Sequence, residues 1–178
     1  FGMPMEGHTE AALSEEEILG ILAAQIARGP AGEHKEDILR RVVRFSQRTA
    51  RQAMIPRVDV FYLPVHTSMA RAVESMRIQQ YSRIPLSKSA APDQILGYVY
   101  WKDVLSMPSA EATLEAHMRP VLFVAESQGL VTVLREMQHT KIHFAVVVDE
   151  YGGTSGILTL EDLLEEIVGE IRDELDEE

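Results

Sequence analysis

The chain has 178 residues, 46% of them hydrophobic, which is enough for one compact domain or two small halves. Its 28 acidic residues outnumber 17 basic ones, and the formal net charge of −11 disfavours nucleic-acid binding, because phosphate backbones require a basic surface. The absence of cysteine excludes disulfides, thiolate metal ligands and a cysteine nucleophile. No apolar run approaches the roughly 18 residues of a membrane span, and no secretory signal is visible.

The N-terminal region, residues 1–48, is expected to be a linker followed by two helices. Ser14 with Glu17 three residues later forms a capping-box pattern, and an apolar stripe follows at helical spacing. Its members are Ile18, Leu19, Leu22 and Ile26. A glycine- and proline-containing break precedes a second predicted helix at about residues 33–45. The two helices either pack on the main domain or act as a lever to an upstream segment.

Residues 49–109 contain the first copy of an internal repeat. The pattern predicts a short helix over residues 49–54, ended by Pro56, then strands over 59–63, 83–86 and 95–100. Thr67 is the predicted cap of a helix between the first two strands, and residues 101–106 are the predicted last helix.

Residues 110–178 repeat this order. A short helix over residues 112–118 is ended by Pro120, and strands are predicted over 121–124, 143–148 and 155–159. Ser127 is the predicted start of the middle helix, residues 149–153 form a glycine-containing turn, and a helix follows over 160–170. A repeat of this size is typical of a unit that needs its twin to bury its apolar face.

The clearest match between the copies is the segment GYVYWKD, Gly97 to Asp103, which returns as GILTLED, Gly156 to Asp162. Each copy is a strand opened by glycine, followed by a helix start with an acid in its first turn. Unpaired N–H groups and the positive dipole end at a helix N-terminus suit a phosphate. Because a nearby carboxylate can accept hydrogen bonds from sugar hydroxyls, the pattern predicts a nucleotide site rather than a catalytic one.

These halves resemble the tandem CBS domain, or Bateman module. The segment VVVDEYGGTSGILTLEDLLEEIVGEIRDE, beginning at Val146, is similar to the signature of the CorC/HlyC and CNNM group of magnesium and cobalt transport-associated proteins. MIPRVDV, from Met54, and SRIPL, from Ser82, match the same group. The resemblance implies an α/β (α+β) fold of two pseudo-symmetric β-α-β-β-α halves behind an N-terminal helical extension.

The resemblance also implies a function. In that family the CBS pair lies on the cytosolic side of the membrane, often follows a transmembrane domain, and binds adenine nucleotide, commonly ATP with Mg²⁺, to regulate ion efflux. Two pairs usually associate into a disc-like homodimer. Because this chain opens on Phe1 and closes on an acidic stretch, we expect it to be the cytosolic part of a longer membrane protein.

In the second half, the family pattern places nucleotide contacts at two residues. Thr159 would contact phosphate or ribose, and Asp162 would accept hydrogen bonds from the ribose hydroxyls. The simpler interpretation is structural, with Thr159 as an N-cap and Asp162 as a favourable first-turn acid.

The first half would supply the other wall. Ile55 matches a position that lines the adenine pocket. The strand segment beside the phosphates is Ser82, Arg83, Ile84 and Pro85. Arg83 is the expected phosphate ligand, because its planar fork binds oxyanions bidentately. The alternative is that Arg83 is an ordinary arginine paired with one of the many acids.

The first-half motif departs from the pattern, since Tyr100 stands where Thr or Ser is expected, although Asp103 is present. One working site per chain is therefore predicted. The acids crowding residues 161–170 are expected to form a solvated face, with Mg²⁺ arriving with the nucleotide. The six histidines lack zinc-site spacing, so no protein metal site and no catalytic residue is predicted.

The sequence thus favours a non-enzymatic sensor of adenine nucleotide. A nucleotide-hydrolysing enzyme would need a base and a positioned water, for which no candidate is evident. A purely structural dimerisation module with a dead nucleotide site is the more serious alternative.

Overall fold

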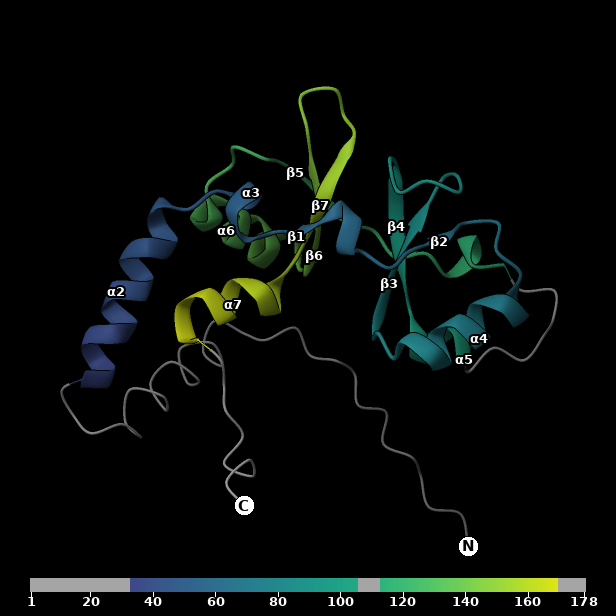
Figure 1. Ribbon diagram of the computed structural model, residues 1–178, viewed down its shortest axis with the longest axis horizontal. Coiled ribbons are helices and arrows are strands. Elements are labelled where there is room, and N and C mark those ends of the chain that lie inside the picture. The colour runs from purple at the N-terminus through teal and green to yellow at the C-terminus, as the bar shows by residue number, and fades with distance from the viewer. Residues whose placement is uncertain (1–32, 106–112, 170–178) are drawn as a thin grey trace, which may run out of the picture.

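The computed structural model describes residues 33–105 and 113–169 (Figure 1). The predicted helix near residues 14–26 and the preceding linker lie outside the described residues, as do the ends of the predicted helices 101–106 and 160–170. The second predicted N-terminal helix is present as α2 (Glu33–Gln47). Among the described residues, none of the helices combines the length and the apolar character that crossing a bilayer requires.

The first repeat forms a three-stranded sheet in the order β2-β3-β4. Its elements are α3 (Ala50–Ala53), β1 (Ile55–Pro56), η1 (Arg57–Asp59), β2 (Leu63–Pro64), α4 (Met69–Gln79), β3 (Arg83–Ser87), β4 (Ile95–Tyr100) and α5 (Trp101–Leu105). Strands β2 and β3 are parallel, and β3 and β4 are antiparallel. Strand β1 is not part of this sheet.

The second repeat forms a four-stranded sheet in the order β1-β7-β6-β5. Its elements are η2 (Glu115–His117), β5 (Leu122–Ala125), α6 (Leu130–Thr140), β6 (Phe144–Val148), β7 (Thr154–Thr159) and α7 (Leu160–Val168). Asp149 N–H donates to the Gly153 carbonyl at 2.9 Å and Gly152 has φ of +80°, so the predicted turn is confirmed. The predicted β-α-β-β-α order is confirmed in both halves.

The two halves exchange their N-terminal segments. Strand β1, from the first repeat, pairs with β7 of the second, with Ile55 opposite Ile157. Reciprocally, Arg119 of the second repeat bridges to Tyr98 in β4 of the first. Both crossings follow the repeat spacing, since 64 residues separate Ile55 from Arg119 and 59 separate Tyr98 from Ile157.

This exchange explains the repeated glycines. A Cβ on Gly97 would come within 2.6 Å of the Arg119 carbonyl oxygen, and a Cβ on Gly156 would overlap the Ile55 carbonyl oxygen. Only glycine lets the crossing backbone approach each strand so closely. The glycine that opens each copy of the motif is therefore required by the exchange of segments.

Three apolar clusters hold the fold together. One lies in the second half, beneath α6 and α7, and includes Phe45 of α2 and Ala50 of α3. A second lies in the first half and includes Leu114 from the other repeat. The third lies between the halves and contains Phe144 and Ile157. The two halves therefore bury surface against each other and do not form separate cores.

Among the described residues, helix α2 packs on α6 and α7 (Figure 1). Of its predicted apolar positions, Ile38 and Phe45 are buried. The other three, Leu39, Val42 and Val43, are exposed. The helix therefore belongs to the main domain, as the packing interpretation predicted, while its outer face carries an apolar stripe.

Several predicted boundaries were wrong. The strand expected over residues 59–63 is a 3-10 turn followed by an extended crossing, and pairing begins only at Leu63. Because this segment must travel from β7 to the other sheet, Val60 and Tyr62 pack on the shared core instead of joining a ladder. The helix expected over 112–118 is the short turn η2, for the same reason.

Two predicted helix caps were also displaced. The N-cap of α4 is Ser68 rather than Thr67, and that of α6 is Gly129 rather than Ser127. The sequence places several capping residues close together in each loop, and the backbone turn decides between them.

Candidate functional site

The junction of β7 and α7 forms what we call the Thr159 end: Thr159, Glu161 and Asp162 with Arg83 and Ile55 of the first repeat. Thr159 is the N-cap of α7, and its Oγ1 accepts from Asp162 N–H at 3.2 Å. Asp162 Oδ2 in turn accepts from the Thr159 N–H and hydroxyl, both at 2.7 Å. Both residues thus have the capping role that the structural interpretation gives them. None of the three bonds uses Asp162 Oδ1.

The Thr159 end opens on the junction between the halves. Side chains two apart along a strand share a face, so Thr159 lies on the same face of β7 as Ile157. Ile157 belongs to the core shared by the halves, and Ile55 is its partner across the β1–β7 pair. The structure therefore brings Ile55 and Thr159 to neighbouring strands, as the predicted site requires.

Arg83 reaches this end from the opposite half. Its Nη2 lies 2.9 Å from Glu161 Oε1, joining β3 to the first turn of α7. The Arg83 side chain is 20% exposed and that of Glu161 is 54% exposed. The predicted alternative for Arg83, pairing with an acid, is thus present. Because Glu161 directly precedes Asp162 in the chain, this contact brings the Arg83 guanidinium to the same turn of α7 as Asp162.

The other residues of the predicted strand segment, 82–85, do not all point in the same direction. Pro85 shares a face of β3 with Arg83, toward Tyr98 on β4. Ile84 points the other way and is fully buried in the first-half core, so a ligand contact from Ile84 would have to come from its main chain. Ser82 is exposed, and its carbonyl accepts from Trp101 N–H at 3.0 Å.

The corresponding junction of β4 and α5 forms the Tyr100 end: Tyr100, Lys102 and Asp103 with Arg119 and Phe144 of the second repeat. The Phe144 ring stacks on Tyr98 of β4, with the ring centroids 5.0 Å apart. Arg119 donates from Nε and Nη2 to Asp103 Oδ2, at 3.0 and 2.6 Å. Its Cζ lies 5.6 Å from the Tyr100 ring centroid, and Lys102 Nζ lies 5.9 Å from the same centroid. The acid of the first-half motif is therefore paired with an arginine of the chain itself.

Electrostatics at the Tyr100 end reinforce that pair. The hydrogen bond to Asp103 raises the pKa of the Arg119 guanidinium, and partial burial only partly opposes this. A base whose pKa is raised on folding stabilises the fold at every pH below its unfolded value. The stabilisation that Arg119 contributes is therefore lost only as pH rises through its raised pKa.

Two important residues at these ends were missed from the sequence. Arg119 was not singled out, although it stands 64 residues after Ile55, the same spacing as the two prolines. Glu161 was placed on a solvated face, and its pairing with Arg83 was not foreseen. Extending the repeat alignment outside the strongest motif would have found Arg119. The Glu161 contact depends on how the halves meet, which the sequence pattern does not encode.

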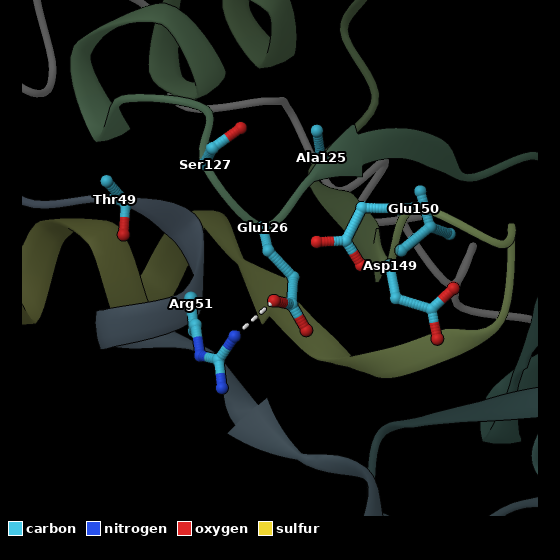
Figure 2. Close-up of a pocket in the computed structure, with 8 residues that line it drawn as sticks. Thr49, Arg51, Ala125, Glu126, Ser127, Asp149 and Glu150 are labelled. Atoms are coloured by element: carbon cyan, nitrogen blue, oxygen red, sulfur yellow. Dashed lines mark hydrogen bonds and ion pairs between the residues drawn. The ribbon is translucent and has the colours of Figure 1, made fainter.

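A separate pocket lies at the opposite end of the second sheet (Figure 2). It has a volume of about 280 Å³ and sits where β5 and β6 end. Its lining residues are Thr49, Arg51, Ala125, Glu126, Ser127, Val148, Asp149 and Glu150. Arg51 is paired with Glu126 at 2.7 Å, and Asp149 accepts from two turn amides. None of the predicted nucleotide residues lines this pocket.

Within residues 33–105 and 113–169, no group of three or more His, Asp or Glu side chains is arranged to hold a metal ion.

This arrangement matches solved structures along nearly all of its length. The CBS domain of the bacterial CNNM/CorC family Mg²⁺ transporter superposes with a TM-score of 0.75 at 34% identity, covering 90% of this chain and 99% of that one. The chain belongs to the CBS domains of the CNNM/CorC family. The resemblance drawn from the sequence is thereby confirmed. The model for the CBS domain also matches residues 114–169 of this CBS chain.

Two further comparisons bear on this CBS chain. A structure of the CNNM/CorC CBS domain in complex with ATP has a TM-score of 0.72 at 34% identity, covering 77% of this chain and 99% of that one. The UPF0053 protein YhdP of Bacillus subtilis (strain 168) is 34% identical over 99% of this chain. The chain spans only 40% of the length of that relative.

Proposed function

We propose that the Thr159 end binds an adenine nucleotide, most favourably ATP with Mg²⁺, and that binding regulates ion efflux by an attached or partner membrane domain. The observation that carries this proposal is the convergence of Arg83, Thr159 and Asp162 from two repeats on one junction. The ATP complex of a relative at 34% identity supports the ligand class.

Each residue has a defined role in this proposal. Asp162 Oδ1 accepts from a ribose hydroxyl while Oδ2 continues to cap α7, so binding does not cost the helix its cap. Ile55 contributes apolar contact to the adenine ring. Arg83 rotates from Glu161 to the phosphates, and its fork donates to two oxyanion oxygens.

Magnesium has a specific part to play. When Arg83 leaves Glu161 for the phosphates, it leaves a half-exposed carboxylate beside further negative charge. A divalent cation bound by phosphate oxygens neutralises this repulsion. Nucleotide affinity is therefore expected to fall when Mg²⁺ is replaced by EDTA.

Regulation follows from the position of the site between the halves. A ligand that contacts both Arg83 and Asp162 favours whichever arrangement of the halves places them together, and its binding free energy shifts that equilibrium. We place the module on the cytoplasmic side of a membrane, within or beside a transporter of Mg²⁺ or Co²⁺, and expect it to act as a homodimer.

Catalysis is not part of the proposal, since the site offers no evident general base for a water. Steady phosphate release from ATP above the level of a buffer control would favour a nucleotide hydrolase instead. The other alternative, a structural dimerisation module, requires that no nucleotide binds.

The test is calorimetric titration of ATP, ADP and AMP, each with Mg²⁺ and with EDTA. We expect saturable binding near one equivalent of ATP per chain and weaker binding in EDTA. Absence of heat with every nucleotide would favour the dimerisation module. Equal ATP affinity with Mg²⁺ and with EDTA would remove the role given to the cation.

A further inference from the structure

The Thr159 end and the Tyr100 end occupy equivalent places in the repeat but differ in most of their side chains. The equivalent pairs are Ile55 and Arg119, Thr159 and Tyr100, Glu161 and Lys102, and Asp162 and Asp103. Strand pairing adds a fifth, because Arg83 lies opposite Tyr100 while Phe144 lies opposite Thr159. Of these, only the aspartate is the same at both ends.

Arg119 is held firmly at the Tyr100 end by its backbone. Its N–H donates to the Tyr98 carbonyl at 2.7 Å, and its carbonyl accepts from the Tyr98 N–H at 3.1 Å. Pro120 follows directly and restricts Arg119 to an extended backbone. The backbone of Arg119 is therefore fixed beside β4, so pairing its side chain with Asp103 costs little conformational entropy.

The Arg119 side chain contacts two residues of the Tyr100 end. Two N–H groups of Arg119 converge on a single oxygen of Asp103, and the guanidinium lies near the Tyr100 ring. At the Thr159 end the corresponding residue, Ile55, has no charge with which to engage Asp162. The difference between the two crossing residues thus decides whether the motif aspartate faces a tethered cation.

We propose that Arg119 excludes ligands from the Tyr100 end, acting as a tethered cation that occupies Asp103, and that it thereby limits the chain to one nucleotide. The ligand class in this proposal rests on the proposed function. Tyr100 adds bulk, but Arg119 supplies the competing charge. A nucleotide entering this end would have to displace an intramolecular partner whose effective concentration is high.

The test replaces residues of the Tyr100 end by their equivalents from the Thr159 end and measures how many additional AMP molecules each chain binds. The variant combines Arg119→Ile with Tyr100→Thr, and AMP is the probe because Phe144 stands where the phosphate-binding Arg83 would be. We expect the variant to bind one more equivalent of AMP than the parent chain, measured by calorimetry. The matched control is Arg57→Ile, which removes another exposed arginine paired with an aspartate, Asp93, and should gain none.

The outcomes separate this inference from the proposed function. A folded variant with no gain over the parent would overturn the role of Arg119, as would two equivalents bound by the parent itself. If the parent binds nothing, the proposed function fails, while a gain of one equivalent still supports Arg119 as the excluding residue. Should circular dichroism show the double variant to be unfolded, Arg119→Gln alone is scored in the same way.

Discussion

The two motif ends of this CBS pair share one backbone design but differ in their functional groups. Both have a strand opened by glycine, a crossing segment from the other repeat, and an aspartate in the first turn of a helix. Yet one end pairs Arg83 with Glu161 between the halves, whereas the other pairs Asp103 with Arg119. The backbone and the buried core are therefore alike in the two repeats, whereas the side chains at the two ends differ.

The frame itself is symmetric in detail. Ala50 of the first repeat is fully buried in the second-half core, and Leu114, 64 residues later, is fully buried in the first-half core. Each sheet has a register shift, after Leu86 in β3 and after Val147 in β6. Because both repeats share these buried residues and register shifts, they do not distinguish the end that binds a ligand.

The largest expected effect tests whether the halves fold as one unit. Phe45→Ala empties space in the second-half core and should lower the free energy of unfolding by about 4 kcal/mol. Leu114→Ala does the same in the first-half core and should cost about 3 kcal/mol. Urea unfolding followed by circular dichroism should show one shifted transition in each case. Two separated transitions would break the account of a shared core.

The next effect tests the symmetry of the crossings. Gly156→Ala and Gly97→Ala each force a Cβ into the crossing backbone, and each should cost about 3 kcal/mol. Gly129→Ser is the control, since nothing lies within 4 Å of that position and serine is a favourable N-cap. Thermal unfolding of the three variants decides the point. A marked stability difference between the two alanine variants would show that the crossings are not equivalent.

A smaller effect separates the ends by ligand affinity. Arg83→Gln removes the guanidinium assigned to the phosphates and should weaken ATP binding about tenfold, the usual size for a lost charge-assisted contact. Arg51→Gln, which removes an arginine from the pocket at the far end of the sheet, is the matched control. Calorimetry with ATP and Mg²⁺ measures both. Equal weakening by the two substitutions would point to bulk charge rather than a contact at the Thr159 end.

The smallest effect concerns the carboxylate that competes for Arg83. Glu161→Gln should strengthen ATP binding in EDTA by about threefold, because a half-exposed ion pair of this kind contributes about 0.2–1 kcal/mol. Glu150→Gln, an exposed acid at the other end of the sheet, removes the same charge and should leave the affinity unchanged. Weaker binding in Glu161→Gln would mean that Glu161 assists the ligand instead of opposing it.

Much of the fold was predictable because local chemistry and tertiary packing agree. The apolar runs that became β4 and β6, and the motif around Thr159, were placed from pattern alone. The segment after Pro56 was mistaken for a strand, because its apolar residues pack on the shared core while its backbone crosses between sheets. Such a crossing has no periodic signature, so only the structure reveals it.

The candidate site was predictable only in part. Repeat comparison found Thr159, Asp162 and the altered Tyr100, and pairing in space brought Arg83 to the same junction. Ile84 was chosen as part of a contiguous motif, yet strand alternation turns its side chain into the core. Arg119 and Phe144 make contacts between the repeats, which a comparison of one motif at a time does not capture.

The most direct test of the difference between the two ends is the pair of variants Asp162→Ala and Asp103→Ala, titrated with ATP and Mg²⁺. The two aspartates hold the same place in the repeat, so each variant controls for the other's loss of charge. We predict that Asp162→Ala loses at least tenfold in affinity while Asp103→Ala binds like the parent chain. Loss of binding in Asp103→Ala with Asp162→Ala unaffected would contradict it.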